Sequence, residues 1–398
     1  MRPEPAPPAP TPPTRREPVP PALSEHHHGS HQHLAVEVRA EPVAAARVDA
    51  IVVPTIRHPI WLRHAIKLAR DLDCPLVTLH SGGRSSAATA AEAMPGGVRH
   101  LAVDLGDPAG LNLPSFETTA MLRHTRFERR TDLAPKRNLG LLLARLMGWR
   151  RIVFLDDDIE VSGAGEVRRA ASLLDVYDAV GMRIGGFPDN SVVCHAHRET
   201  GGAQDSFIGG GALAVETTRE PSFFPNVYNE DWFYLLHDKS LRLLAVTGHV
   251  RQRPYNPYDR PARARDQELG DVLAEGVYWL LDDGQSRDWQ TAADVAYWKR
   301  FLGKRRAFIE DVLRRVRALA PGSALDRRAM EASLVAARGR LDCIEPEFCV
   351  AYISAWAKDR ERWARHLDDL GTGGASVDEA LHRLVRNGAN PLKRKYLL

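Results

Sequence analysis

Three adjacent carboxylates, Asp156–Asp158, follow an apolar run that ends at Leu155. Like charges this close repel one another, so a triplet at the end of a buried strand costs stability unless a cation balances it. Carboxylate oxygens suit Mg²⁺ or Mn²⁺, and either metal would bridge the phosphates of a diphosphate. The triplet therefore predicts a divalent metal site with Asp156 and Asp158 as ligands. An Asp-rich turn without a metal is the alternative.

The elements that must position this triplet follow an α/β pattern. Short apolar runs typical of buried strands alternate with stretches whose apolar residues recur at helical spacing. Such alternation predicts a mostly parallel sheet with flanking helices, in which ligands bind beyond the carboxyl ends of the strands. Pro54-Thr55 and the Asp triplet both lie at such ends. The predicted strands are Asp49–Pro54, Pro75–His80, Arg99–Val103 and Arg151–Leu155, and the main helices between them are Ile60–Asp71 and Leu133–Gly148.

Three regions of different composition follow one another along the chain. Residues 1–33 are rich in Pro and His, bury too little apolar surface to fold, and are expected to be a disordered tail. Residues 34–261 carry the α/β pattern, and Gly209–Gly211 marks a place where backbone must approach another strand or a ligand. Residues 262–398 have helix-period apolar positions and are expected to be all-helical.

Composition excludes several classes of protein. The 398 residues carry 54 basic and 51 acidic side chains, a balance that does not call for nucleic acid as a partner. Four scattered cysteines without a CxxC pair argue against a disulfide scaffold and against a structural zinc site. No run of 18 apolar residues is present to span a membrane, and the N-terminus lacks the apolar core of a secretory signal. The expected compartment is the cytoplasm.

Four short motifs give the segment from about 49 to 250 a resemblance to the GT-A class of nucleotide-sugar glycosyltransferases, in particular the family 2-like enzymes. They occur in the order typical of that class, and they cover roughly half of the chain. The motifs are Val52–Arg57 at the first strand, Lys136–Gly140 at a helix start, the DxD triplet Asp156–Asp158, and Gly209–Ala212 followed by Asn229–Trp232 with its Glu-Asp pair.

The resemblance implies transfer of a sugar from a nucleotide-diphosphate sugar to an acceptor hydroxyl, with Mn²⁺ or Mg²⁺ acting as a Lewis acid on the leaving diphosphate. Asp231, together with Glu230, is implied as catalytic, with Asp231 as the base if the reaction inverts configuration. The same pair also suits a helix N-terminus. The remaining implied contacts are Pro54, Thr55, Arg57, Ser81, Lys136, Arg137, Asn138, Asp156 and Asp157 for the donor, Gly210 and Gly211 for the acceptor, and Asp156, Asp158 and His249 for the metal.

The sequence departs from the family pattern at two points. The second strand ends in His80-Ser81-Gly82, where the family usually has an Asp that reads the nucleotide base, and the QxxRW motif of processive synthases is absent. Pro54–Arg57 with the Asp triplet also resembles the reversibly glycosylated polypeptides, which are nucleotide-sugar mutases. A GT-A fold that has lost activity and serves as a binding module is a further alternative.

Two other enzyme classes fit poorly. A haloacid-dehalogenase-like phosphatase needs Thr or Val where Glu160 stands, and an NAD-binding Rossmann enzyme needs glycines that the turn at Thr55–Pro59 lacks. In the C-terminal region, Lys299–Arg317 predicts a basic amphipathic helix. Such a helix could contact an anionic membrane surface, although it more often packs on its own domain.

Overall fold

The computed structural model describes residues 30–39, 46–187, 191–205, 207–282, 288–320, 325–386 and 392–397. Most of the predicted tail, with the histidines at 26–28, lies outside these ranges. The described residues 30–33 belong to the segment predicted to be a disordered tail, and they pack against the rest of the protein. His31 is buried, with its ring centroid 5.4 Å from that of Trp232, and its Nδ1 pairs with Asp282. His33 Nε2 lies 2.7 Å from the same carboxylate.

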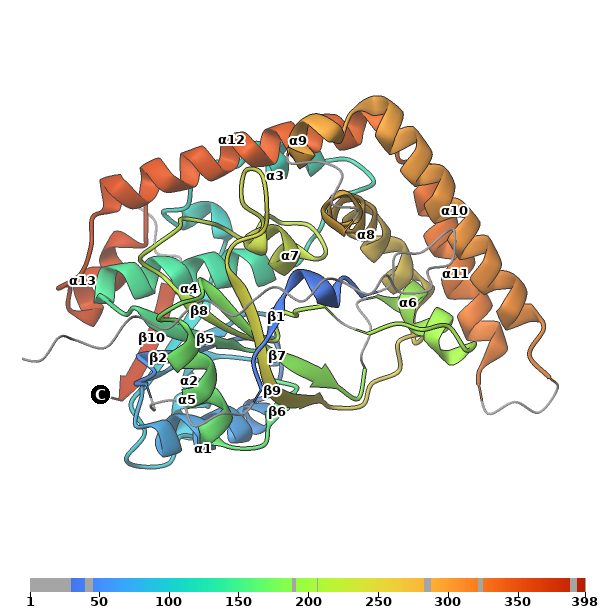
Figure 1. Ribbon diagram of the computed structural model, residues 1–398. Coiled ribbons are helices and arrows are strands. Elements are labelled where there is room, and N and C mark those ends of the chain that lie inside the picture. The colour runs from blue at the N-terminus through green and yellow to red at the C-terminus, as the bar shows by residue number, and fades with distance from the viewer. Residues whose placement is uncertain are drawn as a thin grey trace, which may run out of the picture.

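A single mixed sheet forms the centre of the molecule (Figure 1). Within the described residues its strand order is β1-β9-β7-β8-β5-β2-β3-β4-β10, with β6 paired to β9. Most pairings are parallel, while β8, β6 and β10 pair in antiparallel fashion with their neighbours. The strands are β1 Val36–Glu37, β2 Ala50–Thr55, β3 Leu76–His80, β4 His100–Leu105, β5 Arg151–Leu155, β6 Ile159–Val161, β7 Ala179–Gly185, β8 Ala212–Glu216, β9 Leu244–Gln252 and β10 Leu392–Leu397.

Helices cover both faces of the sheet, which confirms the predicted α/β class with a helical C-terminal region. They are η1 Gln32–Leu34, η2 Pro59–Leu62, α1 Arg63–Leu72, α2 Ala87–Glu92, η3 Pro108–Gly110, α3 Glu117–Leu122, α4 Leu133–Met147, α5 Ala164–Leu173, α6 Val192–Glu199, α7 Glu230–Leu235, α8 Pro261–Asp282, α9 Trp289–Ala292, α10 Val295–Arg317, α11 Arg327–Leu341, α12 Pro346–Leu370 and α13 Val377–Arg383.

The alternation of side chains along the strands creates two cores. In β2, Ala50 and Val52 point into the larger core, shared with α4 and the C-terminal helices, whereas Ile51 and Val53 point into the smaller core under α1 and α5. Because both faces of the strand are covered, β2 reads as a continuous apolar run and is buried throughout.

Helix α4 is seated on the sheet by a glycine. A Cβ on Gly140 would lie 3.0 Å from Val52 Cγ1 and 3.1 Å from Phe154 Cε1, so this position must stay small for α4 to lie against β2 and β5. The close approach brings the first turns of α4, with Lys136 and Arg137, to the ends of those strands. The helix stops at Gly148, which adopts a left-handed φ of 70°.

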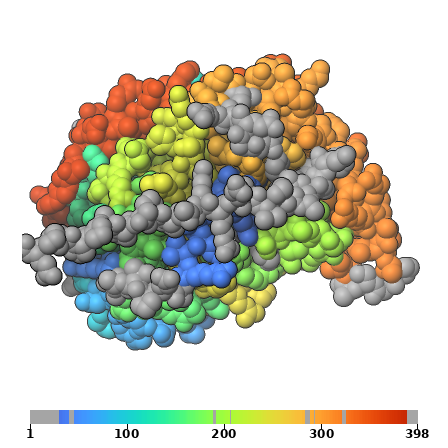
Figure 2. Space-filling view, viewed as in Figure 1, coloured from blue at the N-terminus to red at the C-terminus, as the bar shows by residue number. Residues whose placement is uncertain are grey.

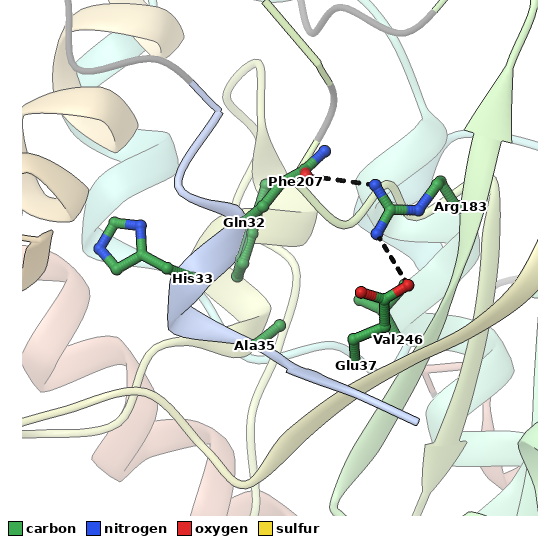
Figure 3. A pocket seen from close by; sticks show the side chains of 7 residues that line it. All are labelled: Gln32, His33, Ala35, Glu37, Arg183, Phe207 and Val246. Atoms are coloured by element: carbon green, nitrogen blue, oxygen red, sulfur yellow. Dashed lines mark hydrogen bonds and ion pairs between the residues drawn. The ribbon is translucent and has the colours of Figure 1, made fainter. Parts of the chain in front are cut away.

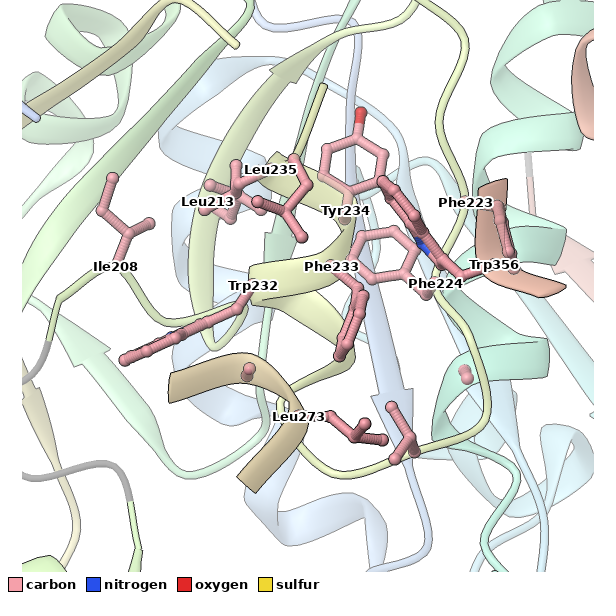
Figure 4. Close-up of a cluster of buried hydrophobic side chains, with 14 of the residues drawn as sticks. Ile208, Leu213, Phe223, Phe224, Trp232, Phe233, Tyr234, Leu235, Leu273 and Trp356 are labelled. Atoms are coloured by element: carbon pink, nitrogen blue, oxygen red, sulfur yellow. The ribbon is translucent and has the colours of Figure 1, made fainter. Parts of the chain in front are cut away.

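The C-terminal helices form one side of the molecule and share the larger core with the sheet (Figure 2). Figure 4 shows the side chains of α7, including Trp232, Phe233 and Leu235, between the sheet and residues such as Leu273 of α8 and Trp356 of α12. The apolar face of α10 is buried there. Arg305 is buried as well, so the predicted contact of 299–317 with a membrane surface would rest on the exposed basic residues of this helix, such as Lys299 and Arg300.

Two further observations concern the C-terminal region and membranes. The region is not all-helical as predicted, because its last described residues form β10, which pairs with β4 at the sheet edge. That pairing joins residues almost 300 positions apart, which no local sequence pattern reveals. Across the described ranges, no helix has both the length and the apolar character needed to cross a membrane.

Candidate active site

The candidate site lies where the order of the strands reverses. After β2 the chain adds β3 and β4 on one side, and it then returns to place β5 on the other side of β2. At such a switch point the connections leave in opposite directions, which opens a crevice at the carboxyl ends of the strands. Thr55 ends β2 and Asp156–Asp158 follow β5, so both predicted motifs lie at the carboxyl ends of these two neighbouring strands, at the switch point. Pro54 is buried within β2, beside Leu79 of β3.

Arg57 binds two of the three aspartates. Its Nη1 pairs with Asp157, and its Nη2 donates to Asp158 Oδ2 at 3.0 Å. Thr55 Oγ1 also donates to Asp157 Oδ2, at 2.5 Å. Burial raises the pKa of Asp157, and burial together with the neighbouring charge of Asp156 raises the pKa of Asp158. The Arg57 side chain is 40% exposed, so an incoming anion can reach its guanidinium group.

Arg137 connects the Asp triplet to the Glu-Asp pair. Its Nη2 donates to Asp156 Oδ1 at 3.1 Å, and its Nη1 donates to Glu230 Oε1 at 2.6 Å. The guanidinium group is buried, whereas the Asp156 side chain is 31% exposed. Burial alone would lower the pKa of Arg137, but the carboxylates around it raise that pKa. One buried cation therefore joins the end of β5 to the start of α7.

Lys136 lies at the carboxyl ends of β2 and β3 and stabilises them. Its Nζ donates to the Thr55 carbonyl oxygen at 2.9 Å and to Ser81 Oγ at 2.6 Å, and it pairs with Asp132 at 3.0 Å. Burial lowers its pKa. Lys136 and Arg137 are thus both buried and bonded within the protein, and that they also contact a donor phosphate stays a prediction.

Asn138 has a structural role in this arrangement. Its Nδ2 donates to the Phe224 carbonyl oxygen at 2.8 Å, and its Oδ1 accepts from the Phe224 N–H at 2.8 Å. Both ends of the amide are therefore engaged with backbone in a buried position. In this structure the amide holds the Phe224 backbone, and that Asn138 also contacts the donor stays a prediction.

The two catalytic candidates, Glu230 and Asp231, open helix α7. Asp231 Oδ2 accepts from the Gly210 N–H at 2.5 Å, and its Oδ1 accepts from the Trp232 N–H at 3.0 Å. Burial raises the pKa of both acids. The predicted base is therefore a partly buried carboxylate held by two backbone donors, and it is a stronger base than an exposed aspartate.

The predicted close approach at the glycine segment is confirmed. A Cβ on Gly210 would lie 2.5 Å from Arg137 Nη1, and a Cβ on Gly211 would lie 3.2 Å from Asp156 Oδ2. The Gly211 carbonyl oxygen also accepts from the Asp156 N–H at 2.9 Å. Small residues are needed here because the backbone runs directly over the charged groups of the site.

His249 does not join the Asp triplet. In the pairing of β6 with β9, Ile159 lies opposite Gln252 and Val161 opposite Val250. His249 is therefore four residues from Arg253, whose N–H donates to the Asp158 carbonyl oxygen, and at ~3.3 Å per residue that spacing is about 13 Å. The predicted ligand set of Asp156, Asp158 and His249 is corrected accordingly: of these three, only the aspartates lie together.

The predicted donor and metal contacts leave out two residues near the triplet, Trp61 and Arg253. Two guanidinium groups lie over the Trp61 ring, with Arg57 Cζ 4.9 Å and Arg253 Cζ 5.0 Å from its centroid. Arg253 also pairs with Glu160 at 2.8 Å. Only the Asp132–Lys136 pair had a local signal, its spacing of four residues on a helix.

Two cavities among the described residues have linings that do not include the Asp triplet. One, of about 270 Å³, is lined by residues of η1, β1, β7 and β9 and by Phe207, which precedes the glycine segment (Figure 3). Within it Arg183 Nη1 donates to Gln32 Oε1 at 3.1 Å and its other Nη lies 3.5 Å from Glu37. The second, of about 290 Å³, includes His249 together with Glu166 and Arg169. Neither lining includes Asp156, Asp157 or Asp158.

Comparisons with known proteins do not identify a family for this chain. No protein-family model matches the chain, and no curated protein matches it. The chain is similar to the solved structure of A197 from STIV, with 12% identity, a TM-score of 0.27, and coverage of 51% of this chain and 83% of that one. It is also similar to a protein from Desulfovibrio desulfuricans G20 provisionally named a nucleotide-diphospho-sugar transferase, with 10% identity, a TM-score of 0.29, and coverage of 67% and 98%. At these TM-scores the similarities carry no argument about function, which therefore has to rest on the site.

Proposed function

We propose that this protein is a metal-dependent glycosyltransferase that moves a sugar from a nucleotide-diphosphate sugar to an acceptor hydroxyl. One observation supports this proposal above the others. Five carboxylates, Asp156–Asp158 with Glu230 and Asp231, gather around two guanidinium groups at the switch point of the sheet. Negative charge therefore exceeds positive charge in a place where ligands of α/β proteins bind.

The carboxylate oxygens of Asp156 and Asp158 suit a hard divalent cation. Within the described residues no group of three His, Cys, Asp or Glu side chains converges on one point, so a metal would rest on Asp156 and Asp158 alone. This matches the way Mg²⁺ is usually held, by one or two carboxylates with water and substrate phosphates completing the shell. Burial and the neighbouring charge of Asp156 raise the pKa of Asp158, and a cation bound between the two carboxylates would offset this repulsion. When bound, the metal would supply Lewis-acid stabilisation of the leaving diphosphate.

The side chains of the protein account for the other roles. Arg57, exposed at the mouth of the crevice and stacked on Trp61, can pair with a donor phosphate. Asp231 would take the proton of the acceptor hydroxyl while the acceptor oxygen bonds to the anomeric carbon and the bond from that carbon to the diphosphate breaks. Arg137 keeps Glu230 and Asp156 at a fixed separation, so that acceptor and donor sides stay aligned.

A second candidate function, a binding module without catalysis, is favoured by a different observation. Four of the five carboxylates are already engaged by Arg57 or Arg137, so the site is held together without any ligand. In that case the protein would bind a nucleotide diphosphate without consuming it. The mutase alternative would act on the same donor without a separate acceptor.

Hydrolysis and transfer assays separate these functions. A panel of nucleotide-diphosphate sugars is incubated with the protein and Mn²⁺ or Mg²⁺, and release of the nucleoside diphosphate is measured. We expect release with at least one donor, loss of release when EDTA is added, and loss in Asp158→Asn. The matched control is Asp175→Asn, which changes an exposed aspartate 57% accessible to solvent. Binding of a donor without any release would favour the binding module, and release that EDTA leaves unchanged would refute metal dependence.

A further inference from the structure

The turn before Glu230 and Asp231 is held by the C-terminal helical region. Asn229 adopts a left-handed conformation with φ of 59°, and its carbonyl oxygen accepts from Trp232 N–H at 3.1 Å, the first backbone bond of α7. Its side-chain Nδ2 donates to Asp271 Oδ1 of α8 at 3.0 Å, in a buried position. The direction in which α7 starts, and therefore the placement of Glu230 and Asp231, depends on how Asn229 is held.

The backbone of α8 also lies directly against this turn. A Cβ on Gly270 would lie 2.2 Å from the Tyr228 carbonyl oxygen, so no larger residue fits between helix and turn. Gly270 and Asp271 are neighbours in the chain, and together they contact the two residues that precede Glu230. The contact thus combines close backbone packing with a side-chain hydrogen bond.

Asp271 is itself fixed by a buried charge cluster between α8 and α10. Arg305 Nη2 donates to Asp271 Oδ2 at 2.8 Å, and the same guanidinium group binds Glu268 through two hydrogen bonds of 2.9 and 3.0 Å and Glu275 through one of 2.8 Å. All four side chains are buried. Buried ion clusters of this kind often stabilise a protein no more than apolar residues would, so net stability is a weak explanation for the cluster. The cluster does hold the Asp271 carboxylate in one orientation, with Oδ2 on Arg305 and Oδ1 on Asn229.

We infer that Asp271, held by Arg305, is a positioning residue for Asp231. The inference rests on the proposed function, because it concerns the acid expected to act as base. It gives the helical C-terminal region a defined role, because α8 and α10 then set where the acceptor-side acids stand relative to Asp156. Arg137 joins the same acids to the donor side, so α7 is fixed from both directions.

The kinetic test uses two variants and a matched control. Asn229→Gly removes the side-chain bond, while glycine keeps the left-handed backbone. Asp271→Ala removes the acceptor. The control is Asp359→Ala, another buried carboxylate of the helical region, which accepts bonds of 2.7 and 2.8 Å from the backbone of Glu117 and Thr118 at the start of α3. We expect both test variants to lower kcat by ~10²-fold with donor KM within about twofold, since a misplacement of about 1 Å has that effect. The control should lose stability and keep its kcat.

A second measurement does not require any activity. Amide hydrogen exchange of residues 229–235 is measured on the full chain. Each variant is measured at the same number of degrees below its own melting temperature, so that differences in global stability do not affect the comparison. We expect faster exchange in Asn229→Gly and Asp271→Ala than in Asp359→Ala. If wild-type protein shows no transfer but exchange changes as expected, the proposed function fails and the positioning contact stands. Unchanged exchange, or equal loss of kcat in the control, would overturn the inference.

Discussion

Replacing Gly210 with alanine should impair the site by displacing Arg137. The added Cβ would lie 2.5 Å from Arg137 Nη1, 2.7 Å from Cζ and 2.9 Å from Nη2, whereas ordinary contacts begin near 3.4 Å. The guanidinium group must therefore move by about 0.9 Å, the difference between 3.4 and 2.5 Å. Its bonds of 2.6 Å to Glu230 and 3.1 Å to Asp156 cannot both survive such a shift. Because misplacement by about 1 Å can cost ~10²-fold in rate, we expect kcat to fall by about that factor.

The assay for Gly210→Ala is steady-state release of nucleoside diphosphate from the best donor, with melting temperature measured in parallel. The matched control is Gly96→Ala, an exposed turn glycine whose added Cβ would meet nothing within 4 Å. The control should keep wild-type kcat. If Gly210→Ala stays folded and turns over within twofold of wild type, then Arg137 does not need its observed position and the reasoning is wrong.

Three further predictions concern the base, the charge cluster and the tail. Asp231→Asn should lower kcat by ~10²–10⁴-fold with little change in donor KM. Because burial raises the pKa of Asp231, the wild-type rate should rise with pH through a pKa above that of an ordinary aspartate. Product stereochemistry by NMR checks that the reaction inverts. Burial raises the pKa of Asp271 to about 8. The carboxylates of Glu275 and Glu268 also raise this pKa, and the Arg305 guanidinium group opposes them. Between about pH 4 and 8 the folded protein therefore keeps a proton on Asp271 that the unfolded chain has released. Stability should therefore fall between about pH 4 and 8 by up to about 1.4 kcal/mol per pH unit, and Asp271→Asn should flatten that fall in urea melts. Deletion of residues 1–29 should leave kcat unchanged, whereas deletion of 1–37 should lower the melting temperature, because it removes the packing of His31 on Trp232.

The parts of the site that the sequence predicts are those that follow from strand topology. Thr55, Arg57 and the Asp triplet each stand after an apolar run, and the carboxyl ends of neighbouring parallel strands lie at one edge of a sheet. Gly210 and Gly211 were identifiable because consecutive glycines mark close backbone approach, which the contacts with Arg137 and Asp156 confirm.

The rest depends on register, helix phase and long-range packing, which local patterns do not contain. His249 was expected at the triplet from the family pattern, and the register of β6 with β9 separates the two. Asn138 follows Arg137 directly, yet one further step around α4 turns it toward Phe224. The pairing of Arg137 with Glu230 and of Asn229 with Asp271 joins residues 93 and 42 positions apart. Such pairs become visible only once the chain is folded.

The central claim is that the Asp triplet binds a nucleotide diphosphate through a divalent metal. Calorimetric titration of the full chain with uridine and guanosine diphosphates, each with Mn²⁺ and then with EDTA, tests this claim without requiring an acceptor or turnover. We predict binding of at least one nucleotide that needs Mn²⁺ and is lost in Asp158→Asn but kept in Asp175→Asn. Binding that is unaffected by EDTA and by Asp158→Asn, or no binding of either nucleotide, would contradict the account.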